Sequence, residues 1–504
     1  MLKTVNLLGG TQLHCIKRGI SSIVQTKALI DGAWVEAGNK ATFDVINPAT
    51  GEVLENVPDL GIEETKRAIQ AAKTTFYSKE WSELTGKQRS DLLMNWHRLL
   101  EKNRDDIACI MNAEAGKTLS EAQGEVTYGN SFVKWFAEEA RRIYGEVIEA
   151  PVASRQLFAI RQPIGVAALI TPWNFPHAMI TRKAGAALAA GCTLVIKPAE
   201  DTPLTALAIA KLAQDAGFPK GVFNVITTSR KNAPLVGELL CKSPDVAGIS
   251  FTGSTAVGKQ LYKNCAEGIK RLALELGGNA PFIVFNSANI DQAVEGAMVA
   301  KFRNGGQSCV GANRLFIQDK VYDEFLKKFS EKVCAIKVGS GKDCQLGPVI
   351  NQMQLDKISS FVEDARSKKA SILVGGKKRP DLGSFFFEPT VITDIKPDMK
   401  LYSEEVFGPV ASILKFKDEE EVLQRANAVE SGLAGYFYSQ DLHQVFRVAR
   451  NLEVGMIGVN EGLISTAEAP FGGVKQSGLG REGSRHGIDD FVHIKYICLG
   501  NLIR

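Results

Sequence analysis

The sequence predicts an α/β protein built on two parallel sheets. Between residues 165 and 285, apolar strand-like runs alternate with helical runs, an order that is typical of parallel strands joined by crossover helices. The predicted strands are apolar along almost their whole length, which suits a sheet that helices cover on both faces. The alternation resumes beyond Pro281 and continues to about residue 475. It therefore predicts a second unit of the same class.

The first unit is expected to contain four strands with helices between them. The predicted strands lie at residues 165–170, 193–196, 222–226 and 246–251, and the predicted helices at residues 177–190, at residues 204–216 and from about residue 254. Before this unit, residues 28–35 predict a hairpin with its turn at Asp31-Gly32, a pair that favours tight two-residue turns. Residues 42–48 predict a short strand, and apolar residues at helix spacing predict helices between residues 62 and 145.

Composition and charge exclude several classes of protein. Of the 504 residues, 45% are apolar and 23% are charged, and the net charge is +4 with acids and bases interspersed. A nucleic-acid-binding protein would show a basic stripe, and a membrane span would need a run of about 18 apolar residues; the sequence has neither. The nine cysteines show no paired short spacing. This argues against zinc and against a disulfide scaffold, and it favours a reducing compartment.

The N-terminal segment is basic and free of acids. Four basic residues precede Asp31, which is the first acidic residue of the chain. This composition is typical of a mitochondrial presequence, and we expect residues 1–27 to direct the protein to the matrix. The alternative is an N-terminal tail on a cytoplasmic protein.

Two glycine-rich motifs invite a nucleotide-binding interpretation, and one of them is retained. Residues 253–260 nearly form a Walker A loop, but Gln260 stands where Ser or Thr would hold magnesium, so ATP is excluded. A glycine turn that opens a helix still offers free N–H groups to a pyrophosphate. Residues 478–483 spell G-x-G-x-x-G, but no strand precedes them. We interpret them as a loop with several residues at positive φ.

Two further stretches carry candidate chemistry. Cys309 lies among small and polar residues just after Gly305-Gly306, where the backbone can turn sharply and a nucleophilic thiol can meet a ligand. The alternative is a small hydrophobe in a core. Upstream, Glu275 stands alone between Leu274 and Leu276 beside a second glycine pair. It is either a catalytic base or half of a structural salt bridge.

Together with Thr171–Pro176, the stretches around Glu275 and Cys309 closely resemble the aldehyde dehydrogenase superfamily. The resemblance extends from about residue 28 to the C-terminus. It implies an aldehyde-dehydrogenase-like fold, with two parallel-sheet α/β domains and a small β-extension for oligomerisation. The implied NAD-binding domain comprises residues 28–145 and 165–277, and the implied catalytic domain residues 278–475.

The remaining segments, residues 146–164 and 476–504, are implied to join the subunits of a homo-oligomer, a dimer or a tetramer. We expect the last strand-like run, residues 492–498, to pair with residues 155–161.

The resemblance also implies a mechanism. Cys309 adds to the aldehyde carbon, and the side-chain amide of Asn174 with the backbone N–H of Cys309 stabilises the resulting oxyanion. Hydride then leaves for the nicotinamide, and Glu275 activates the water that hydrolyses the thioester. An apolar site raises a carboxylate pKa toward neutrality, which suits this task.

The cofactor is expected to be NAD, without a metal. The implied contacts are Lys197 and Glu200 to the adenosine ribose, Glu405 to the nicotinamide ribose, and Trp173 and Phe407 at the nicotinamide. Pro198 and Ala199, between Lys197 and Glu200, are also expected to bind the cofactor. The glycine turn that would receive the pyrophosphate adds Gly253, Ser254, Thr255, Ala256, Val257 and Gly258. Carboxylates at Glu200-Asp201 would accept the ribose 2′-hydroxyl and repel a 2′-phosphate. Lys197 could still assist a phosphate, so NADP remains the less favoured alternative.

Substrate choice is expected to depend on Arg182, Arg303 and Ser465, which resemble the pattern of mitochondrial succinate-semialdehyde dehydrogenases. The resemblance implies a pocket that grips the distal carboxylate of a short ω-oxo acid, a task to which arginine is suited. The expected reaction is oxidation of succinate semialdehyde to succinate, as in 4-aminobutyrate degradation. For each arginine the alternative is a surface position or an ion pair between subunits. Some relatives carry a second cysteine at the position of Gly311, which can form a disulfide with the catalytic thiol under oxidation. This chain has glycine there, so that redox switch is expected to be absent.

Two rival functions stay open at this point. One is an aldehyde dehydrogenase for glutarate semialdehyde or simple aliphatic aldehydes. The other is a cysteine-dependent esterase or hydrolase, which would need a histidine base; His177 is the candidate nearest a motif.

Overall fold

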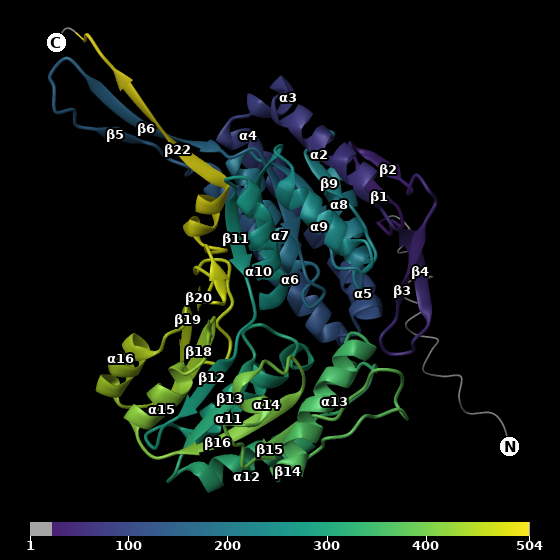
Figure 1. The fold of residues 1–504 in the computed structure, drawn as a ribbon, viewed down its shortest axis with the longest axis vertical. Coiled ribbons are helices and arrows are strands. Elements are labelled where there is room, and N and C mark those ends of the chain that lie inside the picture. The colour runs from purple at the N-terminus through teal and green to yellow at the C-terminus, as the bar shows by residue number, and fades with distance from the viewer. Residues whose placement is uncertain (1–22, 503–504) are drawn as a thin grey trace.

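The computed structural model describes residues 23–502 as two lobes and a projecting arm (Figure 1). The first lobe is built on an eight-stranded sheet. Its strands, in spatial order, are β2 (Ala33–Val35), β1 (Ala28–Ile30), β9 (Phe223–Val225), β8 (Thr193–Lys197), β7 (Val166–Ile170), β10 (Val246–Thr252), β11 (Arg271–Glu275) and β21 (Gly478–Leu479). The five strands from β9 to β11 run parallel, whereas β1, β2 and β21 join antiparallel at the two ends.

The predicted N-terminal hairpin is confirmed. β1 and β2 pair antiparallel across Asp31 (φ +54°) and Gly32 (φ +73°), and two residues with positive φ are the signature of a tight type I′ turn. The four strands predicted between residues 165 and 251 are also present. β11, which ends at Glu275, was not predicted as a strand.

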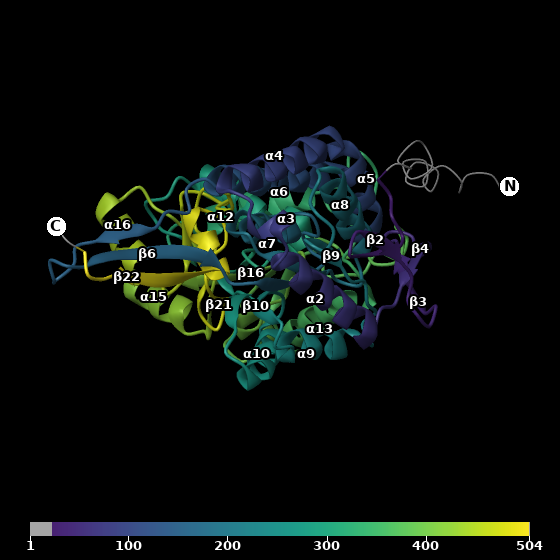
Figure 2. The same cartoon turned by 90° about the horizontal axis from the view of Figure 1, so that it is seen from above.

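Helices cover both faces of the first sheet (Figure 2). One face packs against α4 (Gly86–Lys102), α5 (Arg104–Ala115), α6 (Leu119–Glu139), α7 (Ala178–Ala190) and α8 (Pro203–Asp215). The other face packs against α2 (Ile62–Phe76), α9 (Ala233–Lys242) and α10 (Thr255–Asn264). The short helices α3 (Lys79–Ser82) and η2 (Cys265–Glu267) complete this lobe. Burial on both faces explains why the strands read as continuous apolar runs.

The second lobe is built on a seven-stranded sheet. Its order is β14 (Ser371–Val374), β15 (Thr390–Thr393), β16 (Val410–Phe416), β13 (Ala312–Gln318), β12 (Ala280–Val284), β18 (Ala434–Tyr438) and β19 (Met456–Val459), all parallel except β14. Its helices are α11 (Ile290–Phe302), η3 (Arg303–Gly306), α12 (Tyr322–Cys334), α13 (Gln352–Ser367), α14 (Lys400–Ser403), α15 (Glu419–Asn427) and α16 (Leu442–Asn451). Two small ribbons remain, β3 (Thr42–Ile46) with β4 (Val53–Pro58), and β17 (Ser431–Gly432) with β20 (Val474–Lys475).

The arm is a three-stranded antiparallel sheet that projects from the first lobe (Figures 1 and 2). It contains β5 (Glu146–Ile148), β6 (Gln156–Pro163) and β22 (Val492–Leu499). β22 pairs with β6, with Ile494 opposite Arg161 and Cys498 opposite Leu157, so the predicted pairing of these segments is confirmed. The preceding segment, with β21 and η4 (Arg485–Phe491), packs against the first lobe instead.

Residues 1–22, most of the predicted presequence, lie outside the described residues. Between residues 23 and 502, no helix combines the length and the apolar character that a membrane crossing requires.

Candidate active site

The predicted catalytic residues meet between the two sheets. Asn174 follows β7, and Glu275 is the last residue of β11, so both come from the carboxyl ends of parallel strands, where ligands of such sheets bind. Cys309 arrives from the second lobe, in the loop between η3 and β13. The side-chain Nδ2 of Asn174 donates to the carbonyl of Gln307 at 3.0 Å, which ties the two lobes together two residues before the thiol.

The backbone before Cys309 is coiled in a left-handed turn. Asn304, Gly305 and Gly306 have φ values of +54°, +63° and +70°, a region that favours glycine and, less strongly, asparagine. A Cβ at Gly306 would lie 2.2 Å from the carbonyl oxygen of Gly408, so this position accepts only glycine. The side chain of Asn304 holds the turn by donating to the Asn174 carbonyl at 2.9 Å.

The thiol of Cys309 is half-buried, and burial raises its pKa to about 12. The charge of Arg182 opposes this shift, whereas Glu405 and Glu275 add to it. At neutral pH the group is therefore a thiol, and it must lose its proton as it adds to a substrate.

The main chain of Asn174 is fixed by a buried ion pair. Lys117 donates to the Asn174 carbonyl at 2.7 Å and contacts the carboxylate of Glu125 at 2.5 Å. The other oxygen of Glu125 accepts the backbone N–H groups of His177 and Ala178 at 2.9 and 3.2 Å. Asn174 itself is buried, and its Oδ1 has no hydrogen-bond partner in residues 23–502. The segment that carries this amide is thus anchored on both sides.

Glu275 is a buried carboxyl group whose charge is not paired within the described residues. Its side chain is buried, and neither carboxylate oxygen has a hydrogen-bond partner among residues 23–502. Burial raises its pKa well above the usual value, and the charge of Glu482 adds to the shift against the opposing charge of Arg182. No ion pair holds Glu275 in the described part of the chain, which removes the structural salt bridge as an explanation. A carboxyl group in this state can accept a proton near neutral pH.

Beneath these residues lies a buried ionic cluster. Both Arg182 and Lys183 form ion pairs with Glu482, and Lys183 also donates to Ser250 at 3.1 Å. The guanidinium of Arg182 lies 4.5 Å from the ring centroid of Phe471, and its Nη1 and Nη2 have no hydrogen-bond partner in the described structure. Arg182 is therefore partly neutralised yet retains free donors.

A cavity of about 320 Å³ lies beside this cluster. Arg303, Ser465, Tyr128, Phe175 and Lys117 contribute to its wall. Arg303 lies over the Phe175 ring at 5.1 Å and forms no ion pair within residues 23–502. Among residues 23–502, the buried hydroxyl of Tyr128 has no hydrogen bond of normal length and angle, and Arg182, Arg303 and Ser465 lie near it. The wall also contains the carboxylates of Glu121 and Glu125, which accept the backbone N–H of Asn304 and pair with Lys117, respectively. Arg303 and the hydroxyl of Tyr128 are therefore the donors left for a ligand.

A second group of predicted residues lies on another side of Cys309. Glu405 accepts the backbone N–H of Gly278 at 3.3 Å, and burial raises its pKa to about 7. Phe407 has φ +53°, and its ring meets that of Trp173 edge to face, with 5.5 Å between the ring centroids. A Cβ at Gly278 would lie 2.5 Å from the carbonyl oxygen of Cys309, so the Glu405 loop and the Cys309 loop both converge on this glycine.

The segment predicted for the adenosine ribose follows β8. Lys197 donates to the Pro198 carbonyl at 3.0 Å and lies 3.7 Å from the carboxylate of Glu200, and Ala199 is buried beside them. Arg230, which was not predicted, donates from Nε to Glu200 at 2.7 Å. It is a half-exposed residue of the loop after β9.

The near-Walker segment begins α10, as predicted. The hydroxyl of Ser254 accepts the backbone N–H of Val257 at 3.4 Å and caps the helix. A Cβ at Gly258 would lie 2.4 Å from the Leu276 side chain, so this glycine permits close packing of α10 on the sheet. Gly253, Thr255, Ala256 and Val257 form the turn and the first helical residues.

The Aldehyde dehydrogenase family model matches residues 34–497. The chain belongs to the aldehyde dehydrogenase family. The mitochondrial succinate-semialdehyde dehydrogenase of Hylobates lar is 53% identical over 501 residues, covering 98% of this chain and 93% of that one. A succinate-semialdehyde dehydrogenase [NADP(+)] of Escherichia coli is 51% identical and covers 96% and 100%, and a glutarate-semialdehyde dehydrogenase of Pseudomonas aeruginosa is 51% identical and covers 96% and 99%.

The solved structures show the same fold. Betaine aldehyde dehydrogenase from Staphylococcus aureus in complex with NAD+ has a TM-score of 0.94 at 36% identity, covering 98% of each chain. The predicted fold class, two parallel-sheet α/β units in an aldehyde-dehydrogenase-like arrangement, is confirmed. The protein is an enzyme of this family.

The histidine that a cysteine hydrolase would need is engaged elsewhere. His177 is buried, and its Nε2 bonds to the side-chain oxygen of Asn130 at 2.8 Å. Burial lowers its pKa to about 3, so it is a neutral structural residue of this aldehyde dehydrogenase. Among residues 23–502, no group of three or more His, Cys, Asp or Glu side chains is arranged to hold a metal ion.

Sequence reasoning missed four residues of the site. These are Lys117, Tyr128, Arg230 and Glu482. Lys117 lies in a Gly-Lys-Thr triplet that resembles a phosphate loop, and Glu482 lies within the G-x-G-x-x-G segment, where Gly478, Gly480 and Gly483 do have positive φ. Tyr128 occupies one face of a long helix, and no local sequence pattern indicates that this face borders a cavity.

Proposed function

We propose that this aldehyde dehydrogenase oxidises succinate semialdehyde to succinate with NAD, as in 4-aminobutyrate degradation. The observation that carries the proposal is the cavity that Arg303, Tyr128 and Ser465 line. Within residues 23–502, Arg303 forms no ion pair there, and the Nη atoms of Arg182 and the hydroxyl of Tyr128 lack hydrogen-bond partners. Buried donors without acceptors are costly, and the distal carboxylate of a short semialdehyde would satisfy them. The 53% identical relative acts, by its name, on the same substrate.

In the proposed reaction, Cys309 is the nucleophile. Its thiol releases its proton to water as the sulfur adds to the aldehyde carbon, and the carbonyl oxygen becomes an oxyanion. The nearby charge of Arg182 favours the thiolate. The Nδ2 of Asn174 and the backbone N–H of Cys309 donate to the oxygen of the thiohemiacetal. Preorganised donors of this kind are worth about 10²- to 10³-fold in rate each. NAD supplies the hydride acceptor when bound.

Glu275 serves the second half of the reaction. The thioester on Cys309 must be hydrolysed, and the carboxylate of Glu275 takes the proton of the attacking water. Its apolar surroundings and the absence of hydrogen bonds to its oxygens support this role, because they raise its affinity for a proton.

The residues present fit a nicotinamide dinucleotide. Carboxylates that can accept ribose hydroxyls stand at two separate places, Glu200 and Glu405, and the start of α10 lies at the carboxyl end of β10. Lys197 would bind the adenosine ribose, together with Pro198 and Ala199. Trp173 and Phe407 form an aromatic pair for the nicotinamide end. We propose NAD as the preferred form because the carboxylate of Glu200 can accept a hydrogen bond from the ribose 2′-hydroxyl.

The alternative substrates are glutarate semialdehyde and simple aliphatic aldehydes. A relative named for glutarate semialdehyde is 51% identical, and it differs in substrate by one methylene, which a pocket distinguishes by only about 1–3 kcal/mol. Within this proposal, Arg182, Arg303 and Ser465 hold the carboxylate of either semialdehyde.

We also propose a location and an assembly for the protein. We place the protein in the mitochondrial matrix because of the composition of residues 1–27 and the mitochondrial relatives. We propose a homo-oligomer, dimer or tetramer, joined through residues 146–164 and 476–504. The arm supports this because it exposes Val147, Ile494 and Tyr496 to solvent. The NAD-binding domain is then residues 28–145 and 165–277, and the catalytic domain residues 278–475.

The test of the mechanism is covalent trapping. Glu275→Gln mixed with NAD and succinate semialdehyde is expected to release one equivalent of NADH and to accumulate an acyl group on Cys309, seen by intact-protein mass spectrometry. Cys309→Ala is expected to show neither, while still binding NAD. Sustained turnover by Glu275→Gln at the wild-type rate would refute its role as the base.

A further inference from the structure

We propose that Arg230 is a cofactor-specificity residue, which allows the adenosine end of the site to accept the 2′-phosphate of NADP as well as the 2′-hydroxyl of NAD. The inference rests on the proposed function insofar as Lys197 and Glu200 bind the adenosine ribose. It adds a residue that the sequence did not single out and a cofactor class that the two carboxylates alone would exclude.

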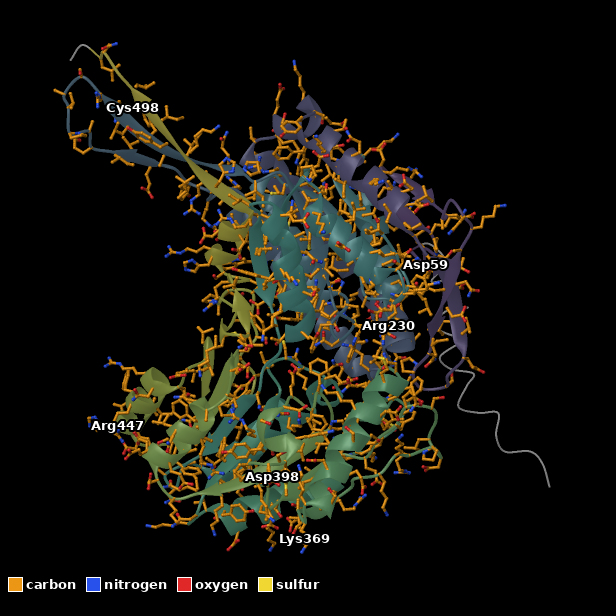
Figure 3. All side chains as sticks on the ribbon, viewed as in Figure 1. Asp59, Arg230, Lys369, Asp398, Arg447 and Cys498 are labelled. Atoms are coloured by element: carbon orange, nitrogen blue, oxygen red, sulfur yellow. The ribbon has the colours of Figure 1, made fainter. Side chains whose placement is uncertain are left out.

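The guanidinium of Arg230 spans both acidic residues of this segment. Its Nε donates to Glu200 at 2.7 Å and its Nη2 donates to Asp201 at 3.2 Å. Its Nη1 lies 2.8 Å from the sulfur of Met353 in the second lobe. Figure 3 labels Arg230 at the edge of the first lobe that faces α13. A second link crosses here, because Asn351 donates to Asp201 at 3.3 Å. Arg230 therefore stands at the junction of the ribose segment and the second lobe.

The net charge of this segment bears on whether a 2′-phosphate can bind. Glu200 and Asp201 alone would place two negative charges beside a 2′-phosphate and repel it. The structure adds Lys197, 3.7 Å from Glu200, and Arg230, in contact with both acids. Two cations and two anions sum to zero. A phosphate approaching this segment meets a neutral cluster that presents guanidinium donors, and the repulsion that favours NAD is largely cancelled.

Lys197 and Arg230 differ in how far their side chains are exposed to solvent. The Lys197 side chain is 7% exposed, whereas that of Arg230 is 47% exposed. An exposed arginine can exchange a carboxylate for a phosphate without leaving a buried charge unpaired, and its planar fork suits two oxygens of a phosphate. When Arg230 turns to a phosphate, Lys197 remains beside Glu200 and Asn351 remains on Asp201. When NAD is bound, Arg230 stays on the acids and Glu200 accepts the ribose hydroxyl.

Equilibrium binding without aldehyde tests this inference. The dissociation constants of NAD and NADP are measured by quenching of tryptophan fluorescence for the wild type, Arg230→Ala and Lys231→Ala. Lys231 is the adjacent exposed cation, so its removal changes the net charge by the same amount. Within residues 23–502, the ion pairs of Glu200 and Asp201 are with Lys197 and Arg230 and not with Lys231. Arg230→Ala is expected to weaken NADP binding by about tenfold or more, as for a lost charged hydrogen bond, and NAD binding by less than about threefold. Lys231→Ala is expected to change neither by more than about twofold.

A third variant changes the carboxylate that Arg230 contacts. Glu200→Gln is expected to weaken NAD binding and to leave NADP binding unchanged or tighter, because the amide removes one negative charge next to the phosphate.

Four results would overturn the inference. Equal losses for NAD and NADP in Arg230→Ala would mean that Arg230 only holds Glu200 in place. An equal effect of Lys231→Ala would mean that bulk charge is responsible. A wild-type protein that binds NAD but not NADP would refute dual recognition and leave the proposed function intact. A folded wild type that binds neither cofactor would refute the proposed function as well.

Discussion

The ammonium group of Lys117 lies 2.7 Å from the main-chain oxygen of Asn174. This bond joins the turn between α5 and α6 to the segment that carries the proposed oxyanion donor. Because Lys117 is buried and paired with Glu125, the bond is shielded from water and fixes the direction in which the Asn174 side chain leaves the backbone. The amide then reaches the Cys309 loop through Gln307.

Replacing Lys117 by Met is expected to slow hydride transfer by about 10- to 100-fold, because a shift of about 1 Å in a catalytic group can cost 10²-fold. The rate constant of NADH formation, measured by stopped flow, should fall, while the dissociation constant of NAD should stay within about threefold of the wild type. Lys117→Met/Glu125→Gln removes both buried charges and controls for loss of folding. A well-folded double variant with the wild-type rate of hydride transfer would contradict a positioning role.

Tyr128→Phe is expected to lower kcat/KM for succinate semialdehyde by about tenfold, since a hydrogen bond to a charged group contributes about 1.5–3 kcal/mol. The value for pentanal, which lacks a carboxylate, should change little. Thr127→Val is a control from the same cavity wall, because the Thr127 hydroxyl is already bonded to the Gln123 carbonyl. If Tyr128→Phe lowered kcat/KM equally for both substrates, Tyr128 would act on packing and not on the carboxylate.

The acid limb of the pH profile is expected to belong to Glu275. Its pKa is raised well above 4.5 by burial and by Glu482, and only its deprotonated form can take a proton from water. Thioester hydrolysis should therefore rise with pH through a midpoint well above 4.5. At the acidic end the pre-steady-state burst of NADH should persist while steady turnover falls. A steady rate that is flat down to pH 5 would exclude Glu275 as the base.

Glu482→Gln is expected to lower the free energy of unfolding by about 3–5 kcal/mol, because it leaves two buried cations, Arg182 and Lys183, without their shared partner. Urea denaturation followed by circular dichroism measures the change. Glu267→Gln is the matched control, since its ion pair with Lys242 is exposed and such pairs contribute little. Equal stability of the two variants would show that the buried cluster does not depend on Glu482.

The fold and the residues that meet at the candidate site could be predicted from the sequence because each depends on a contiguous signal. Apolar strands followed by helices predict a parallel sheet whatever lies elsewhere in the chain, and the predicted pairing of residues 492–498 with residues 155–161 is present as β22 and β6. Cys309, Glu275 and Asn174 lie in long motifs that can be matched segment by segment.

Residues that act through contacts between distant segments were not accessible in this way. Arg230 reaches Glu200 across 30 positions, and Lys183 reaches Glu482 across 299. Local pattern does not predict such pairs. The Glu200-Asp201 pair illustrates the consequence, because it predicts repulsion of a 2′-phosphate until the two nearby cations are placed beside it.

In the proposed function, the cavity holds the carboxylate of a semialdehyde through Arg303. The most direct test compares kcat/KM for succinate semialdehyde and for pentanal, with NAD, in the wild type and in Arg303→Ala. Arg303 is half-buried and forms no ion pair in the described structure, so its loss should leave the fold intact. We expect a strong wild-type preference for succinate semialdehyde that collapses in the variant by about 2–5 kcal/mol. Equal handling of both aldehydes by the wild type would contradict the carboxylate pocket and leave an aldehyde dehydrogenase of another specificity.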